Sequence, residues 1–305
     1  MFYQIKNLQK KSLGEPIMAL FVNTNTSSIN AQRNLSKSTN ALNSSYTKLA
    51  SGNRINSAKD DAAGLQIADR MTSQINGLTQ GNRNANDGIS LCQTTEGALD
   101  EVTNMLQRMR TLAVQSANGT NSTDERTAIN DEAKQLQAEI TRIGNGTKFG
   151  GASNNVFKDD TTTFQVGADN GSSSQITLTR KTMAQVLGGT AACTTNSTTG
   201  VSTGFAIDLS SRTTSQAAID KLDAMIKSVD SYRAELGATQ NRLESAISNQ
   251  ENVIENVSDA RSRIKDVDYA SETAKMAQQQ ILQQASTAML SQANQKNSIA
   301  LNLLG

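Results

Sequence analysis

The chain contains no histidine and no tryptophan, and its single proline is Pro16. Without histidine it lacks the side chain that most often serves as a general base or as a metal ligand. Aromatic residues make up 3% and hydrophobic residues 36% of the 305 residues, which is too little for a thick globular core but enough to line narrow seams between helices. Because no proline follows Pro16, very long helices are permitted. The composition favours a helical structural protein and disfavours an enzyme.

The charge balance limits the partners that the chain can bind. Lysine and arginine number 29 and aspartate and glutamate number 28, so the basic excess that a nucleic acid or an anionic membrane surface requires is missing. No apolar run reaches the length that spans a membrane. We therefore expect no nucleic-acid partner, no membrane partner and no cofactor.

The two cysteines, Cys92 and Cys193, lie far apart and form no CxxC motif, so a disulfide framework is not supported. Cys92 is predicted to be a small buried residue on a helix face. Cys193 lies in a Thr-rich segment, where a free and exposed thiol is expected.

Both ends of the chain carry apolar residues at helical spacing. Leu35, Leu42 and Leu49 recur every seven residues in the first part. A second stripe near the other end comprises Ile264, Val267, Ala274, Ile281, Ala285 and Ala288. Such spacing places one narrow apolar stripe on each helix, and a lone helix of this kind is marginal in water. We expect the two terminal helices to gain order by packing against each other and against other copies of the chain.

The segment after the first helix is also predicted to be helical. Apolar residues step by threes and fours from Ala68 to Ala113, on both sides of a polar stretch at 82–88. Ser122 and Glu125 have the spacing of a capping box and predict the start of a further helix.

The middle of the chain loses this helical period. Residues 164–166 and 176–178 alternate as strands do, and the sequence Asp-Asn-Gly at 169–171 between them is typical of a turn, so a β-hairpin is predicted. Residues 190–204 are rich in Thr, Ser, Gly and Asn and predict an exposed loop. Helical stepping returns from Leu222 and runs into the C-terminal helix.

These elements predict a mainly α protein. We expect an elongated, hairpin-like rod of long coiled-coil-like helices, with a small β-hairpin region in the middle and with adjacent termini. An α-helix rises about 1.5 Å per residue, so the C-terminal helical pattern alone would extend over tens of ångströms.

Several longer motifs identify a family. They are Ser51–Gly64 (SGNRINSAKDDAAG), Asn84–Ser90 (NANDGIS), Thr94–Leu99 (TTEGAL), Leu106–Gln115 (LQRMRTLAVQ), Ile264–Ala270 (IKDVDYA), Gln292–Gln295 (QANQ) and the Leu303-Leu304 ending. Together and in this order they closely resemble bacterial flagellins, in a short form that lacks the large outer domains. The resemblance covers about 19–150 and 205–305.

The resemblance implies a division into domains. Residues 19–60 and 266–305 would be the paired terminal helices of the inner filament-core domain. Residues 61–160 and 205–265 would form a helical rod domain. Residues 161–204 would hold the β-hairpin and a Ser/Thr-rich variable loop, and the resemblance leaves open whether residues 194–203 carry O-linked sugar.

The resemblance also implies a function and a set of partners. The chain would be a structural subunit that is exported unfolded and polymerises through its terminal helices into the extracellular flagellar filament used for motility. Its partners would be further copies of itself, a flagellar export chaperone and the type III export apparatus, the filament cap and hook-junction proteins, and the vertebrate Toll-like receptor for flagellin.

Two sets of contact residues follow from the resemblance. In flagellins, the positions that match Arg108, Leu112 and Glu132 are implied to be lateral filament contacts and to be bound by that receptor. Arg108 and Leu112 lie one helical turn apart and are expected to share a face. The predicted assembly seam comprises Leu35, Leu42, Leu49, Ile281, Ala285 and Ala288.

Two other functions fit the sequence less well. A hook–filament junction protein shares the terminal helices, but such relatives usually lack the full signature of residues 84–115. An enzyme displayed on the filament would carry an HExxH motif in a central insert, which a chain without histidine excludes. Asp60, Asp61 and Asp87 are predicted to cap helices and support packing rather than to bind a metal ion.

The chain departs from the family pattern in three places. Cys92 stands where a smaller residue is usual, and no proline follows Gln292–Gln295. Residues 1–17 have no counterpart, and their three lysines and one glutamate would enter a crowded filament core, where unpaired charges are costly. We therefore expect the natural chain to start at Met18, so that 1–17 is a mis-annotated extension.

Overall fold

The computed structural model describes residues 24–151, 154–188, 193–196, 201–205 and 207–304. The expectation for residues 1–17 therefore lies outside the described part. The chain divides into two compact units. We call residues 1–68 and 261–305 the terminal unit, and residues 69–260 the middle unit. Long helices dominate both, and the mainly α class with a small β region is confirmed.

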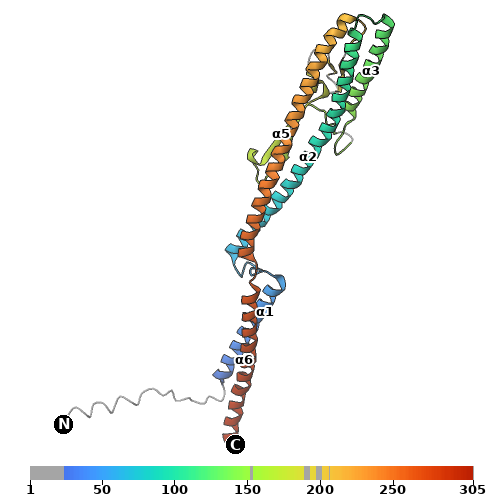
Figure 1. Cartoon of the computed structure of the whole chain (residues 1–305). Coiled ribbons are helices and arrows are strands. Elements are labelled where there is room, and N and C mark those ends of the chain that lie inside the picture. Colours follow the sequence, from blue (N-terminus) through green and yellow to red (C-terminus); the bar gives the residue numbers. More distant parts are fainter. Residues whose placement is uncertain (1–23, 152–153, 189–192, 197–200, 206, 305) are drawn as a thin grey trace, which may run out of the picture. The chain divides into compact units, whose positions relative to one another are not determined.

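The terminal unit is an antiparallel pair of helices, α1 (Thr26–Ser51) and α6 (Tyr269–Leu304), which run side by side in Figure 1. The Asn25 side chain accepts a hydrogen bond from the Ser28 N–H and so caps α1, while its Nδ2 donates to the carbonyl oxygen of Ala293 at 2.8 Å. The two ends of the described chain are thus adjacent, as predicted.

The seam between α1 and α6 mixes apolar and polar side chains. The α1 side buries Ala31, Ser38, Leu42 and Ser45. Two hydrogen bonds cross to α6. Ser45 Oγ of α1 donates to Glu272 Oε1 at 2.7 Å, and Gln283 Nε2 of α6 donates to Thr39 Oγ1 at 3.3 Å. Hydrogen bonds therefore add to the apolar contacts of the pair, and each contributes about 0.5–1.5 kcal/mol net.

A break separates α6 from the helix that precedes it, α5 (Arg212–Lys265). The sequence pattern runs on from one helix to the other, but the backbone of residues 52–54 pairs with residues 264–267 instead. The Arg54 N–H donates to the Lys265 carbonyl at 2.6 Å, and the Val267 N–H donates to the Gly52 carbonyl at 3.0 Å. Gly52 holds the left-handed φ of 71° that ends α1. Asp268 then accepts the N–H groups of Ala270 and Ser271 and caps α6.

The middle unit packs α2 (Ala62–Ala117), α3 (Thr123–Gly146) and α5 side by side (Figure 1). Its core is a stripe of aliphatic side chains, and the largest that are fully buried include Leu99, Leu106, Met109, Leu222 and Leu236. The predicted capping box of α3 is confirmed, because Ser122 and Glu125 each accept the other's backbone N–H. The polar stretch at 82–88 does not interrupt α2. Cys92 is buried as predicted, and burial raises the pKa of its thiol to about 11.

The predicted β-hairpin is confirmed as β1 (Asp160–Gln165) and β2 (Gln175–Arg180), an antiparallel pair in which Phe164 lies opposite Ile176. A single 3₁₀ turn, η1 (Ser172–Ser174), precedes β2. The hairpin lies against α2, where Asn84 Nδ2 donates to the Gln165 carbonyl at 2.9 Å. Beneath it is a second small apolar cluster of Ala85, Val166, Ile176 and Leu243.

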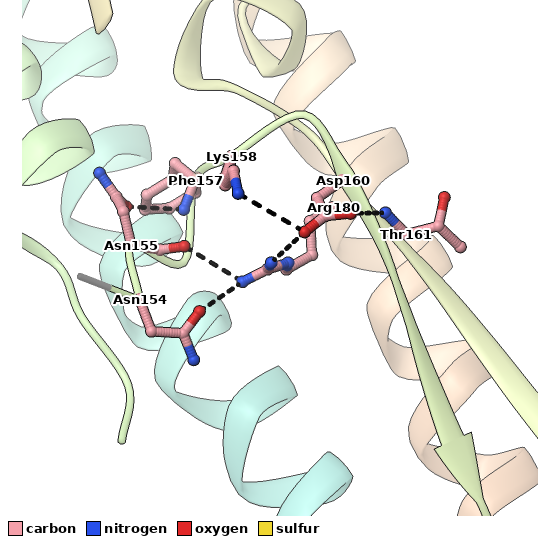
Figure 2. Close-up of polar contacts among 7 residues, drawn as sticks. All are labelled: Asn154, Asn155, Phe157, Lys158, Asp160, Thr161 and Arg180. Atoms are coloured by element: carbon pink, nitrogen blue, oxygen red, sulfur yellow. Dashed lines mark hydrogen bonds and ion pairs between the residues drawn. The ribbon is translucent and has the colours of Figure 1, made fainter. Parts of the chain in front are cut away.

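The end of β2 is held by Arg180, as Figure 2 shows. Its guanidinium group is almost fully buried and donates to Asn154 Oδ1 at 3.0 Å, to the Asn155 carbonyl at 3.2 Å and to Asp160 Oδ2 at 3.0 Å. The Arg180 side chain lowers the pKa of the Asp160 carboxyl group, and the Thr161 N–H adds to this effect. One side chain therefore ties the connection after α3 to both strands of the hairpin.

The prediction of an exposed loop at 190–204 is wrong for part of that range. Residues Cys193–Asn196 (β3) and Val201–Phe205 (β4) pair as antiparallel strands, preceded by the short helix α4 (Met183–Val186). The β-branched threonines and Val201 favour extended structure, which the count of Ser, Gly and Asn had concealed. The side chain of Cys193, expected to be an exposed thiol, lies outside the described part.

Candidate interaction surfaces

The acidic residues near the start of α2 serve the backbone. Asp60 Oδ2 accepts the N–H groups of Asn56 and Ser57, and these bonds lower the pKa of Asp60. Asp61 Oδ1 accepts the Gly64 N–H at 2.9 Å and caps α2. Within the described part of the chain, no three His, Cys, Asp or Glu side chains are grouped so as to hold a metal ion. Asp61 therefore caps α2, whereas Asp60 holds the backbone of residues 56 and 57 in the loop before that helix.

No helix in the described ranges combines the length and the apolar character that crossing a membrane would need.

An exposed apolar surface of the terminal unit lies on α6. We call this surface the α6 stripe, and it comprises Ile281, Leu282, Ala285, Ala288 and Met289. Ile281 and Met289 are each 65% exposed and Leu282 is 43% exposed. No charged residue lies between Lys275 and Lys296. An uncharged and exposed apolar stripe of this kind marks a surface that another molecule covers.

A groove runs beside the α6 stripe. It has a volume of about 410 Å³ and is lined by Ser27, Asn30, Ala31 and Asn34 of α1 and by Leu282, Ala285, Ser286, Met289, Gln292 and Ala293 of α6. Its walls are small or neutral side chains, so a neighbouring helix can approach the backbone closely without meeting a charge. The stripe and the groove together form one continuous face.

The six residues of the predicted assembly seam do not come together. Leu42 is buried and Leu35 and Leu49 are half-buried on the face of α1 that packs within the subunit. Ile281, Ala285 and Ala288 are exposed on the α6 stripe. One half of the predicted seam therefore stabilises the subunit itself, and the other half remains available to a partner.

Glu272, which no sequence motif indicated, is a buried carboxylate in the seam between α1 and α6. Its Oε1 accepts from Ser45 Oγ at 2.7 Å, and its Oε2 accepts from Lys275 Nζ at 3.3 Å. The hydrogen bond from Ser45 lowers the pKa of Glu272 below its ordinary 4.5, and the charges of Lys275 and Lys48 lower it further. The carboxylate is therefore better stabilised in the folded than in the unfolded chain.

This pKa shift predicts a loss of stability in acid. Because the folded-state pKa of Glu272 is lowered, its contribution is complete above the unfolded-state pKa of about 4.5 and is lost as pH falls through the folded-state value. We expect α1 and α6 in assembled protein to exchange backbone amides more slowly in the native chain than in Glu272→Gln at pH 7. The difference should shrink below about pH 4.5. A gap between the two proteins that stays constant from pH 7 to pH 3 would contradict this assignment.

Arg108 on α2 and Glu132 on α3 form an exposed ion pair. Arg108 donates through two nitrogens to Glu132 Oε1, at 2.7 and 2.9 Å, and the side chains are 56% and 45% exposed. An exposed pair of this kind contributes at most about 1 kcal/mol to stability. About half of each side chain is accessible to a partner.

The expectation that Leu112 shares this exposed face is corrected by the structure. Leu112 is 2% exposed and belongs to the main core of the middle unit. A spacing of four residues places two side chains near one another along a helix, but the edge of the core passes between Arg108 and Leu112. Leu112 supports the helix that carries Arg108 and offers no surface of its own.

A known relative matches nearly the whole chain, and two family models match most of it. The model of the bacterial flagellin N-terminal helical region matches residues 22–160, and that of the C-terminal helical region matches residues 219–304. A flagellin of Halalkalibacterium halodurans is 45% identical over 287 residues, which cover 93% of this chain and 100% of the relative.

Two solved structures are also similar to this chain. A Bacillus cereus flagellin is 30% identical, with a TM-score of 0.45 over 55% of this chain and 88% of its own. A protein described as a candidate flagellar hook-associated protein from Vibrio parahaemolyticus has a TM-score of 0.53 and covers 68% of this chain and 100% of its own. At 15% identity this second likeness concerns the fold alone.

Proposed function

This chain belongs to the bacterial flagellin family and is a structural subunit, not an enzyme, of the extracellular flagellar filament used for motility; we propose that its subunits join through the α6 stripe and the adjoining groove. The observation that carries the proposal is the exposure of Ile281, Leu282 and Met289 on an uncharged face of α6. A subunit that polymerises with itself provides the partner for such a face, and burying it contributes about 25 cal/mol per Å² of apolar area.

The same features support export before assembly. Much of the seam between α1 and α6 consists of Ser, Thr, Asn and Gln side chains, which water can hydrogen-bond when the two helices separate. We therefore propose that the subunit travels unfolded through the type III export apparatus, with an export chaperone covering its apolar stripe. The filament cap and the hook-junction proteins are the partners that we propose at the two ends of the filament. A role as a hook–filament junction protein remains the alternative, and no observation favours it.

Polymerisation of the purified chain tests the proposal. Added to sheared filament fragments as seeds, the protein should extend them into long filaments that are visible by negative-stain electron microscopy. A chain that ends after Lys275 lacks the α6 stripe and should leave the seeds at their original length. Seeds that fail to grow with the full chain, or that grow equally with the shortened one, would overturn the assignment.

We also propose that the exposed Arg108–Glu132 pair is a contact for the vertebrate Toll-like receptor that senses flagellin. Arg108→Ala and Glu132→Ala should each lower receptor activation about 10-fold or more, because a charged side chain at the centre of an interface contributes about 2 kcal/mol or more. A reporter-cell assay with purified monomer measures this potency.

The matched control for the receptor test is Arg142→Ala. Arg142 is also an exposed arginine in an ion pair, with Glu139, but it lies on α3 and not on α2. This variant should retain full potency. Leu112→Ala is expected to act differently, by destabilising the core by about 2–5 kcal/mol. Unchanged potency in both Arg108→Ala and Glu132→Ala would remove the pair from the receptor contact.

A further inference from the structure

We propose that Met289 is an oxidation site through which peroxide-class oxidants prevent an unassembled subunit from joining a filament. The proposal rests on the function proposed above for the α6 stripe. It adds a chemical modification that acts on that surface at one atom, the Met289 sulfur.

The described methionines differ sharply in access to solvent. Met289 is 65% exposed, and it is the only one among those in the described ranges that is exposed. The half-buried ones are Met71, Met105 and Met276, and the buried ones are Met109, Met183 and Met225. Oxidation of thioethers follows access to solvent, so a limited dose of peroxide should reach Met289 first.

The chemistry is a two-electron oxygen transfer. The Met289 sulfur donates an electron pair to one peroxide oxygen, the O–O bond breaks and an S–O bond forms, and the remaining oxygen leaves as water. The thioether is oxidised to the sulfoxide and hydrogen peroxide is reduced. Methionine sulfoxide reductases reverse this change. Cys92 does not compete, because it is buried with a thiol pKa of about 11 and so carries little thiolate at neutral pH.

The position of Met289 gives this modification an effect on assembly. Its side chain lines the groove together with the apolar or small Ala31, Leu282, Ala285 and Ala293 and the uncharged polar Ser27, Asn30, Asn34, Ser286 and Gln292. A sulfoxide would bring a strongly polar oxygen into a contact that fits an apolar thioether, and α6 has no charged side chain between Lys275 and Lys296 to bind it. In the assembled filament the same neighbour would cover the sulfur, so the modification acts before assembly and not after it.

The test exposes monomer to limiting hydrogen peroxide, in a Cys193→Ser background so that this thiol does not contribute. Peptide mass mapping should find sulfoxide at Met289 before any of the half-buried methionines. The critical concentration for growth from seeds should rise about 10-fold or more, because a buried polar group without a partner is costly. Filaments treated at the same dose should show little sulfoxide at Met289.

Variants separate Met289 from the other methionines. Met289→Leu keeps an apolar side chain of similar volume but removes the oxidisable sulfur, so its critical concentration, measured first without oxidant, should not change after peroxide. Met276→Leu, on the half-buried side of the same helix, should remain as sensitive as the native chain. Met289→Gln places a permanent polar group at the site and should assemble poorly without any oxidant.

The outcomes also separate this proposal from the one on which it rests. If oxidised Met289 assembles normally, or if Met289→Leu loses assembly in peroxide as the native chain does, the oxidation site is refuted while the α6 stripe stands. If Met289 is oxidised equally in monomer and filament and Ala285→Leu assembles normally, the stripe is not the contact and both proposals fail.

Discussion

Replacing Gly81 by alanine should displace the β1–β2 hairpin from α2. A Cβ atom at this position would lie 1.9 Å from the Val166 carbonyl oxygen and 2.7 Å from its carbonyl carbon. Both are backbone atoms of the strand connection and cannot rotate away as a flexible side chain would. The hairpin must therefore move, and with it the hydrogen bond from Asn84 to the Gln165 carbonyl. We expect a loss of about 1–3 kcal/mol, and more if the small cluster beneath the hairpin opens.

Gly97→Ala is the matched control for this change, because it lies in the same helix and a Cβ added there would meet no atom within 4 Å. In that position alanine should stabilise α2 by about 0.5–1 kcal/mol through its higher helix propensity. The same chemical substitution is thus expected to act with opposite signs at two sites of one helix. Amide hydrogen exchange at Val166 and Gly167, whose N–H groups donate to the Ser174 carbonyl, measures release of the hairpin. Unchanged protection of these amides in Gly81→Ala would contradict the close packing.

Local signals predicted those elements whose causes are local. The capping box at Ser122 and Glu125 and the turn at 169–171 lie within a few residues of the structure that they specify, and both were found. The helical spacing did not indicate the break before α6, because the cause of the break is distant in sequence, although the resemblance to flagellins placed a domain boundary between residues 265 and 266. Gly52 and Arg54 pair with residues 264–267 across about two hundred residues of chain. The single local sign was Asp268, an N-cap residue directly before a helical pattern.

Hydrophobicity alone could not predict which residues lie in the seam between α1 and α6 and which remain exposed on α6. Apolar spacing on α6 selected Ile281 and Ala285, whereas the seam with α1 uses Glu272 and Gln283, which a hydrophobic pattern ignores. Glu272 is buried and Gln283 is half-buried because α1 offers hydroxyl groups at matching positions, and such complementarity appears only when both helices are in place. The same limit applies to Leu112. Its spacing from Arg108 is a property of one helix, but its burial depends on the helices packed against it.

Ala285→Leu should leave the subunit folded and block its polymerisation. Ala285 is exposed and lines the groove beside the α6 stripe, so the larger side chain meets no atom of its own subunit that must move. At a contact between subunits the same change overpacks the seam at a cost of about 1–3 kcal/mol for each contact. Because about 1.4 kcal/mol corresponds to tenfold in an equilibrium constant, the critical concentration should rise about 5- to 150-fold.

Growth of seeded filaments, followed by light scattering and electron microscopy, measures this critical concentration, and circular dichroism of the monomer verifies the fold. Ala138→Leu, at an exposed position of α3, makes the same substitution away from the stripe and should polymerise as the native chain does. If Ala285→Leu assembles at the native concentration, a neighbouring helix does not approach this part of α6 closely. If it fails to fold as a monomer, the groove is filled from within the subunit. Because the substitution changes only the face that is left open in the single subunit, a folded monomer that no longer elongates would assign that face to the contact between copies.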